Sequence, residues 1–480
     1  MRERRHTLNG GFTGAPAAAT PIRRTGYNDA KTLESENSNT NNVWSATRTS
    51  STTNNNKNNS NYVRPVAALG EWETFYKSVI EAFKDCLRHK LSKKQAMEYL
   101  PVAAEDIPLL AWDMWTMCYE PSVSICFMVL FPKLREVFAA AFRDRIVHHW
   151  ICLRLSPVYE YYCWRLGNPT HACRVGFGNR TAIAQVEGAM YDLSGHYHRP
   201  CWIYKGDIVS FFMSIDKAVM WRIMRRVIEA NRERWTAWEY DLLLYLTEIT
   251  IMHCPHKNCI VKSDISLWQQ IDPDKSMFYV AEGKAMPIGN LTTQLFAGFY
   301  MLGMIKFTSG RFRHYLGADW RTHASLTVSV DDYAMVCDNQ KVLKLVIREV
   351  EAYLHDELLL KCHSEKTYLQ PVSHGVKFLG KWIKPHRRYT ITRTVNRFRE
   401  AVRRSIAAAE NGISPIGAES ILASLNSYLG ILKGTRSHRI IEQAFAEVTP
   451  AWKQYFEYRN YKITLKQWTQ KNFRSHGSVA

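Results

Sequence analysis

The stretch VSVDDYAMV, residues 328–336, sets two adjacent acids inside an alternating apolar pattern. This alternation, continued over residues 326–337, predicts a β-hairpin that carries Asp331 and Asp332. An Asp-Asp pair alone is more often a turn or a solvated edge. Between apolar neighbours such as Val328 and Val336, however, the pair would be costly to bury unless something balances its charge.

A third acid, Asp207, ends the β-rich run CWIYKGD, residues 201–207. A carboxylate at a strand end, beside an acidic pair on a hairpin, is the set that two-metal phosphoryl transfer requires. The two cations lie ~3.5–4 Å apart, so several converging carboxylates must neutralise them. Because Mg²⁺ keeps waters and substrate phosphates as ligands, few protein groups are needed. We therefore expect Asp207, Asp331 and Asp332 to hold two Mg²⁺ ions.

The segment KAMPIGNLTTQLFAGFY, residues 284–300, predicts a Pro-Ile-Gly turn that leads into a helix over residues 291–305. Gly289 allows close backbone approach, and the start of a helix can face a base pair or a phosphate. A core helix that merely begins at a glycine explains the apolar residues. It does not explain Asn290, Thr292 and Gln294.

Composition favours a polyanionic partner. The chain has 480 residues, 63 Lys and Arg against 44 Asp and Glu, and a formal net charge of +19. Nucleic acid is the first candidate, with an anionic membrane surface or a merely soluble basic surface as alternatives.

A hydrophobic content of 46% excludes a wholly disordered chain. No stretch approaches the ~18 apolar residues of a membrane span, and the N-terminus lacks a secretory apolar region. The eleven cysteines are then expected to be reduced thiols of a cytoplasmic protein.

Along the chain, strands and helices alternate without a regular βαβ repeat, which favours the α+β class. The Asn/Ser/Thr-rich residues 1–70 predict a disordered tail, with a linker over 62–70. A helix is expected over residues 72–87 and another over 136–155. Further helices are expected over 214–231 and 342–354, strands over 376–383 and 389–391, and a mostly helical basic region from Val395. A zinc site in HCPHKNC, residues 253–259, is disfavoured by its spacing.

These segments resemble, in order, the motifs of reverse transcriptases, over about residues 131–433. GDIVSFFMSID resembles motif A, AMPIGNLTTQLFAGFY motif B and VSVDDYAMV motif C. The fingers motifs resemble two segments of this chain, FPKLREVFAAAFRDRIVHHW and HACRVGFGNRTAIAQ. Motifs D and E resemble the segment LLLKCHSEKTYLQPVSHGVKFLGKW. The thumb resembles the segment SLNSYLGILKG. The resemblance implies a right-hand polymerase: N-terminal helices and fingers with the start of the palm over residues 71–206, palm over 207–385, and thumb with C-terminal tail over 386–480.

The subfamily most similar is the reverse transcriptase of diversity-generating retroelements, whose motif B carries Ile/Leu-Gly-x-x-x-Ser-Gln. Here Ile288 and Gly289 begin that motif and Gln294 ends it. Thr293 stands at the position where the subfamily has Ser. Motif C departs further, since Ser329 stands where Tyr is usual. The fingers motif Gly-Lys-Gly-Thr is Gly-Phe-Gly-Asn over residues 176–179, so Arg174 or Arg180 would supply the absent positive charge.

The resemblance also implies roles for individual residues. The carbonyl of Ile208 would complete one metal shell, and Phe212 would exclude a 2′-hydroxyl by its size. Arg145 and Arg174 would hold the triphosphate, and Lys366 would protonate the leaving pyrophosphate. The primer grip would comprise Phe378, Leu379 and Gly380. The nucleic-acid backbone would contact the basic residues Arg397, Arg399, Arg403, Arg404, Lys433 and Arg436.

The implied function is the copying of a template-repeat RNA into cDNA, with frequent misincorporation opposite adenine. The implied partners are template RNA, the RNA–cDNA duplex, dNTPs and a small basic helical accessory protein. Residues 42–66 also resemble the variable region of proteins that such elements diversify, so the tail is interpreted as a translated template repeat. Two alternatives remain at this stage: a retron-like or phage-defence reverse transcriptase, and a non-catalytic RNA-binding protein on a polymerase fold.

Overall fold

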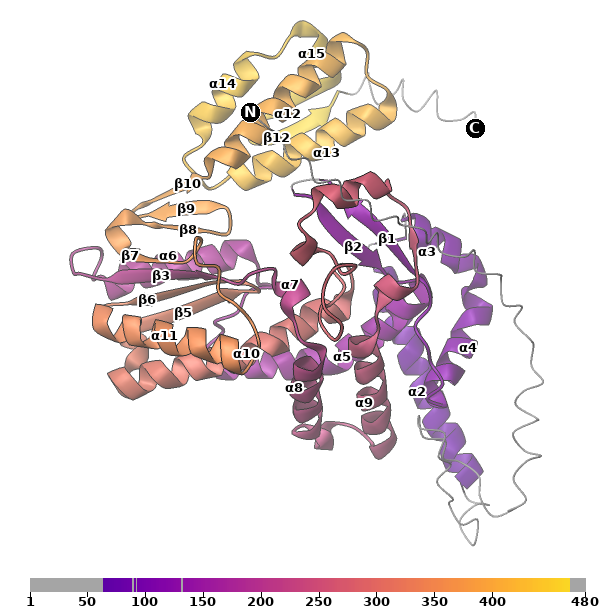
Figure 1. The fold of residues 1–480 in the computed structure, drawn as a ribbon. Coiled ribbons are helices and arrows are strands. Elements are labelled where there is room, and N and C mark those ends of the chain that lie inside the picture. Colours follow the sequence, from indigo (N-terminus) through magenta and orange to yellow (C-terminus); the bar gives the residue numbers. More distant parts are fainter. Residues whose placement is uncertain (1–63, 89, 92, 131–132, 467–480) are drawn as a thin grey trace, which may run out of the picture. The chain divides into compact units, whose positions relative to one another are not determined.

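The computed structural model describes residues 64–88, 90–91, 93–130 and 133–466 (Figure 1). The chain divides into two units, Met1–Glu73 and Thr74–Ala480. Helix α2 (Arg64–Leu87) crosses their boundary. It confirms the helix expected over residues 72–87, but it begins earlier than predicted, so residues 64–70 are helical where a linker was expected. Pro65 is compatible with a first helical turn, and Ala67, Ala68 and Leu69 favour helix. The rest of the predicted tail lies outside the described residues.

A four-stranded antiparallel sheet carries the three acids. Its strand order is β5-β6-β3-β7, with β5 Ala324–Ser329, β6 Asp332–Cys337, β3 Trp202–Asp207 and β7 Tyr368–Pro371. Strands β5 and β6 form the predicted hairpin. Both strands are buried along nearly their whole length, as expected for a sheet that is covered on both faces.

Two different layers cover this central sheet. On one face, Ile203 and Val336 pack with Val186 of α6 (Asn179–Leu193) and with Phe378 of strand β8. On the other face, Tyr204 donates a hydrogen bond to Glu351 of α11 (Gln340–Asp356) at 2.8 Å. The sheet is therefore a rigid platform, and Asp207 and Asp332 lie at one end of it.

A second sheet has the order β2-β1-β4, with β1 Ser124–Val129, β2 Arg135–Ala139 and β4 Cys259–Val261. The helix expected over residues 136–155 was wrong in its first part, because residues 136–139 belong to β2 and helix α5 runs from Phe142 to Arg165. Residues 136–139 form a strand because of contacts with residues far away in the sequence. Glu136 is 1% exposed and accepts hydrogen bonds from Trp268 Nε1, Ser276 Oγ and the Met277 amide. These partners satisfy a buried carboxylate in an extended segment.

The third sheet, β10-β9-β8, comprises β8 Val376–Phe378, β9 Lys381–Lys384 and β10 Arg387–Thr390. The C-terminal part has a separate apolar core around Phe398, Leu425 and Trp452. Its elements are α12 Thr392–Glu410, α13 Pro415–Leu432, α14 His438–Ala446, α15 Pro450–Tyr455, β11 Phe456–Arg459 and β12 Lys462–Leu465.

The remaining α-helices confirm the mixed α+β class predicted from the sequence. Their bounds are α3 Lys94–Tyr99, α4 Ala103–Trp115, α7 Phe211–Ser214, α8 Lys217–Glu229, α9 Ala237–Met252 and α10 Leu291–Leu316. Helix α10 contains the helix expected over residues 291–305 and continues beyond it. Among the described helices, none combines the length and the apolar character that a bilayer crossing demands.

Candidate functional site

The central sheet brings two of the predicted acids face to face. Asp207 at the end of β3 and Asp332 at the start of β6 are directly paired in the antiparallel register. Asp331 lies in the two-residue loop between β5 and β6, beside them. The other loop residue, Val330, has φ 60°. A β-branched residue rarely adopts this conformation, and such strain is typical of functional turns.

A lysine that was not predicted joins the acids. Lys205 stands two residues before Asp207 on β3, so both side chains project from the same face of the strand. Its ammonium lies 3.0 Å from Asp207 Oδ1 and 2.8 Å from Asp332 Oδ1. The Asp332 oxygen is buried and accepts no hydrogen bond from the described residues, so its contact with Lys205 is an ion pair only. In the described part of the chain, no three His, Cys, Asp or Glu side chains are grouped so as to hold a metal ion.

The surroundings shift the pKa of each carboxyl in a different way. Burial and the neighbouring charge of Asp332 raise the pKa of Asp331 to about 6. Burial likewise raises the pKa of Asp332, against the effect of Lys205. For Asp207, burial is outweighed by the hydrogen bond and charge of Lys205 and by the charge of Lys366, so its pKa is lowered. The cluster thus holds more negative charge than one lysine balances, and a further cation would stabilise it.

Other basic groups surround the acids. Lys366 Nζ lies 3.4 Å from Asp207 Oδ2, so the structure places this predicted residue at the site. Lys133, before β2, has its pKa lowered by burial and then by the positive charges of Arg393, Lys366 and Arg135. Sequence reasoning missed Lys133, Lys205 and Arg393. For Lys205, the i, i+2 spacing from Asp207 was an available signal, whereas the approach of Arg393 depends on tertiary structure.

Phe212 and Ile288 border the same apolar cluster, and their expected roles stay predictions. Both pack against the apolar cluster that includes Phe138 and Met213. The Met286 amide donates to the Phe212 carbonyl at 2.8 Å, and the Phe138 amide donates to the Ile288 carbonyl at 2.9 Å. The loop before α10 is therefore bonded both to α7 and to the edge strand β2.

Gly289 and Gln294 occupy different environments. Gly289 has φ 128°, and a Cβ there would lie 2.9 Å from the Phe138 carbonyl oxygen. A side chain at this position would therefore clash with β2, whereas the expected contact with a base pair or phosphate stays a prediction. Gln294 is exposed on the first turns of α10. Ile208 is 2% exposed and its backbone bridges to Cys362.

The two arginines expected at a triphosphate have other partners in the structure. Arg145 Nε donates to the Ala140 carbonyl at 3.0 Å, and its Nη2 contacts Gln95. The Arg174 side chain is 2% exposed and forms an ion pair with Glu160 at 2.6 Å. It also donates to the Thr170 carbonyl and to Asn168. Their role at a triphosphate stays a prediction.

The predicted primer-grip residues form the turn between β8 and β9. Phe378 is 1% exposed in the core. Leu379 and Gly380 both have positive φ, 46° and 77°, as a tight two-residue hairpin requires.

The predicted backbone contacts lie in the C-terminal part of the chain. Arg397, Arg399, Arg403 and Arg404 are on α12, and Lys433 and Arg436 follow α13. Arg403 and Arg404 form surface ion pairs with Glu447 and Glu400. The Arg436 amide donates to the Arg388 carbonyl at 3.0 Å and so connects this region to β10.

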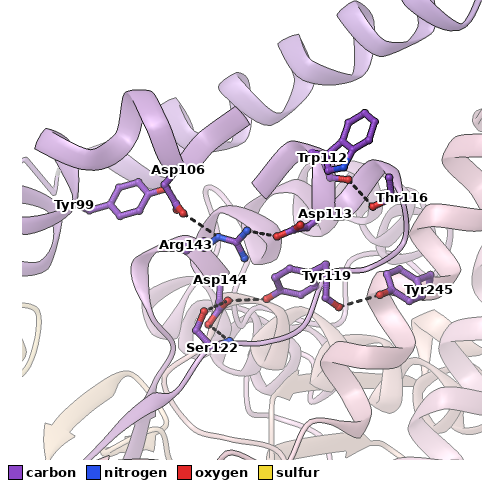
Figure 2. Close-up of polar contacts among 10 residues, drawn as sticks. All are labelled: Tyr99, Asp106, Trp112, Asp113, Thr116, Tyr119, Ser122, Arg143, Asp144 and Tyr245. Atoms are coloured by element: carbon purple, nitrogen blue, oxygen red, sulfur yellow. Dashed lines mark hydrogen bonds and ion pairs between the residues drawn. The ribbon is translucent and has the colours of Figure 1, made fainter. Parts of the chain in front are cut away.

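A polar network supports the start of α5 (Figure 2). Arg143 forms ion pairs with Asp106 and Asp113 of α4, and Asp144 accepts hydrogen bonds from Tyr119 and Ser122. A cavity of about 10 Å³, the volume of roughly one water, lies beside Asp144. Its lining includes Tyr119, Asp144, His148, Asn290 and Thr292. The cavity therefore lies between this network and the loop before α10.

The chain is similar in structure to telomerases. Apo telomerase from Candida tropicalis matches at 13% identity with a TM-score of 0.41, over 69% of this chain and 58% of that one. A form of the same telomerase truncated from its C-terminal domain matches at 12% identity with a TM-score of 0.39, over 57% and 56%. Candida albicans telomerase in complex with a TWJ fragment of telomeric RNA matches at 10% identity with a TM-score of 0.36, over 70% and 56%.

The match thus spans little more than half the length of each telomerase chain. No protein-family model and no curated protein matches the sequence.

Proposed function

We propose that the protein is an RNA-directed DNA polymerase. The observation that carries this proposal is the pairing of Asp207 with Asp332 at one end of the central sheet, with Asp331 in the adjoining loop and Lys366 3.4 Å from Asp207. Three carboxylates with basic groups around them suit a triphosphate and its cations. In this proposal the central sheet is the palm, β1, β2 and β4 belong to the fingers, and α12–α15 form the thumb.

The chemistry of the donors suits Mg²⁺, although Asp207, Asp331 and Asp332 are not grouped in the described structure as a ready metal site. Carboxylate oxygens are the ligands this ion prefers, and the buried Asp332 Oδ1 accepts no hydrogen bond from the described residues. Asp207, Asp331, Asp332 and the Ile208 carbonyl would hold the ions. When bound, Mg²⁺ supplies charge neutralisation at the phosphates and lowers the pKa of the primer 3′-hydroxyl. Because Lys205 now lies between Asp207 and Asp332, its ammonium would have to withdraw from them.

The chain's own residues then orient the reaction. The primer 3′-hydroxyl gives its proton to solvent and its oxygen bonds to the α-phosphorus, while the bond from that phosphorus to the bridging oxygen of the β-phosphate breaks and pyrophosphate leaves. Lys366 would give the leaving pyrophosphate a proton, and its support is its exposed ammonium beside Asp207. Lys133 and Arg135 would pair with the triphosphate from β2 and the loop before it. Phe212 would contact the sugar and reject a 2′-hydroxyl.

Primer extension tests this proposal. We expect the wild-type protein with Mg²⁺ to extend a DNA primer on an RNA template. Asp331→Asn and Asp207→Asn should lower the rate by at least about a thousandfold, since an amide cannot neutralise a cation. Asp338→Asn, at an acid after β6, is the matched control and should retain activity. Extension at the wild-type rate by Asp331→Asn would refute the site.

Within this class we propose a polymerase of a diversity-generating retroelement. Support comes from Ile288, which stands where most reverse transcriptases have Gln and which packs against the same apolar cluster as Phe212. An apolar residue there removes a hydrogen-bond partner for the template nucleotide, which would loosen base selection.

Ile288→Gln should therefore change the misincorporation spectrum at template adenines several-fold, with less change in the overall rate. Sequencing of the cDNA made by both proteins measures this. Val280→Gln, at another partly buried residue of the same cluster, serves as control. Identical error spectra for wild type and Ile288→Gln would remove Ile288 from the explanation.

A further inference from the structure

The sheet β10-β9-β8 has a buried face and an outer face of different chemistry. Val376, Phe378 and Ile383 point into the core, with exposed fractions of 0–1%. Because side chains alternate along a strand, the residues between them face outward. These outward residues are aromatic or basic: Lys377, Trp382, Lys384, Arg387 and Tyr389.

The strand register sets these residues in rows. Lys377 pairs directly with Trp382, and Trp382 pairs with Tyr389 on the next strand. Lys384 pairs with Arg387 in the adjacent row. The rings of Trp382 and Tyr389 have centroids 6.3 Å apart, and Lys384 Nζ lies 4.1 Å from the Trp382 ring centroid. Trp382 is nevertheless 36% exposed, which is high for a tryptophan within a sheet.

The charge on this face has one sign. The pKa of Tyr389 is lowered by a hydrogen bond from Arg387 and by the positive charges of Arg387, Arg436 and Lys384. The neighbouring Arg388 points to the other face, where it pairs with Glu187 of α6. The outer face therefore combines two adjacent aromatic rings with four cations.

We propose that this outer face is a binding platform for single-stranded RNA, with bases stacked on Trp382 and Tyr389 and phosphates paired with Lys377, Lys384, Arg387 and Arg436. Sheets that carry exposed aromatics stack bases in this way in other RNA-binding proteins, and basic residues alongside follow the backbone. The proposal rests on the proposed function, because the strand would be template RNA outside the catalytic cleft. Lys384 would leave the ring and pair with a phosphate.

Binding is measured without polymerisation, by fluorescence anisotropy of a short fluorescein-labelled oligouridine with the full chain and no primer or dNTP. Trp382→Ala and Tyr389→Ala should each weaken binding by about 5- to 150-fold, as loss of one stacked base does. Trp382→Phe keeps a ring and should restore most of the affinity. Trp164→Ala is the control, since Trp164 of α5 is 65% exposed and outside the platform.

Each result has a definite consequence. Unchanged oligouridine binding by Trp382→Ala, or an equal loss with Trp164→Ala, overturns the platform. A loss confined to Lys384→Gln and Arg387→Gln shows a contact by charge alone and overturns the stacking. Thermal unfolding of each variant identifies a folding defect. If the wild type binds oligouridine through Trp382 yet extends no primer, the proposed function fails and the platform stands.

Discussion

At the scale of single residues, Lys205 has a double effect on the acids. Its ammonium is 3.0 Å from Asp207 and 2.8 Å from Asp332, and the residue is only 8% exposed. It thus balances part of the negative charge that would otherwise separate the paired strands β3 and β6. The same position between two carboxylates is one that a divalent cation would favour. We therefore expect Lys205 and Mg²⁺ to compete for the acids.

Substitution of Lys205 by Met tests this competition without any activity measurement. Without metal, Lys205→Met should lower the free energy of unfolding by about 2–4 kcal/mol, because it leaves partly buried carboxylates uncompensated. Added Mg²⁺ should raise the unfolding temperature of the variant more than that of the wild type, since a bound cation replaces the lost charge. Thermal unfolding with and without Mg²⁺ measures both effects.

The matched control is Lys217, which is 2% exposed and donates to the His253 carbonyl at 2.6 Å at the end of α9. It is a buried lysine with no acid partner in the contacts described. Lys217→Met should also destabilise the protein, but Mg²⁺ should not compensate. An equal response of the two variants to Mg²⁺ would show that Lys205 is only a structural lysine.

At the scale of elements, the sequence predicted strands and helices where their pattern is local. The hairpin β5–β6 and helix α11 follow directly from apolar spacing, and both are found. Strand β2 was missed because Glu136 is satisfied by Trp268, Ser276 and Met277, which are more than a hundred residues away in the sequence. Local periodicity holds no information about such partners.

In the candidate site, too, residues with a local sequence signal were predicted and residues placed by the fold were missed. Asp207, Asp331 and Asp332 were predicted because acids among apolar strand residues are conspicuous. Lys205 and Lys133 were missed because a lysine is usually a solvated surface residue, and only the fold shows which ones turn toward the acids. Arg174 was expected at a substrate and has internal partners in the structure, and its role at a substrate stays a prediction.

Helices α5 and α10 are joined by a contact that depends on pH. Thr292 Oγ1 lies 2.7 Å from His148 Nδ1, and both side chains are buried. Burial, with the positive charges of His149, His253 and Arg145, lowers the pKa of His148 to about 3. His148 is therefore neutral in the folded protein, whereas in the unfolded chain it binds a proton near pH 6.5.

Because the folded pKa is the lower one, the stability that His148 contributes is present above pH 6.5 and is lost as the pH falls from 6.5 toward 3. Between pH 7 and pH 5 the loss should be about 2 kcal/mol. His148→Asn should remove that part of the pH dependence, as measured by urea unfolding at both pH values. His355→Asn, at a side chain that is 78% exposed, should leave it unchanged. A pH dependence identical in His148→Asn and wild type would contradict this assignment.

At the scale of the whole molecule, charge governs how the protein meets a polyanion. The formal net charge of +19 is not spread evenly, because α12 alone carries five arginines: Arg393, Arg397, Arg399, Arg403 and Arg404. Just before it on β10, Arg388 pairs inward with Glu187. The apolar face of α12, with Val395, Phe398 and Val402, is buried in the C-terminal core. Its arginines are therefore held on the opposite faces, where they can follow a phosphate backbone.

The affinity for an RNA–DNA hybrid should accordingly fall steeply with salt, because each neutralised phosphate releases counterions. The double variant Arg403→Gln, Arg404→Gln should weaken binding to all sequences alike and reduce the slope of log affinity against log salt by about 1.4–1.8. The fold should survive, since these side chains are 70% and 59% exposed and their ion pairs with Glu447 and Glu400 are superficial. Arg225→Gln is the control, because it breaks an equally exposed ion pair with Glu229 on α8. It tests whether the loss of any surface arginine changes the salt dependence, and it should leave the slope unchanged. Filter binding over a range of salt concentrations measures all three proteins. A slope that is the same in the double variant and the wild type would mean that α12 does not contact the backbone, and that the excess positive charge acts elsewhere on the molecule.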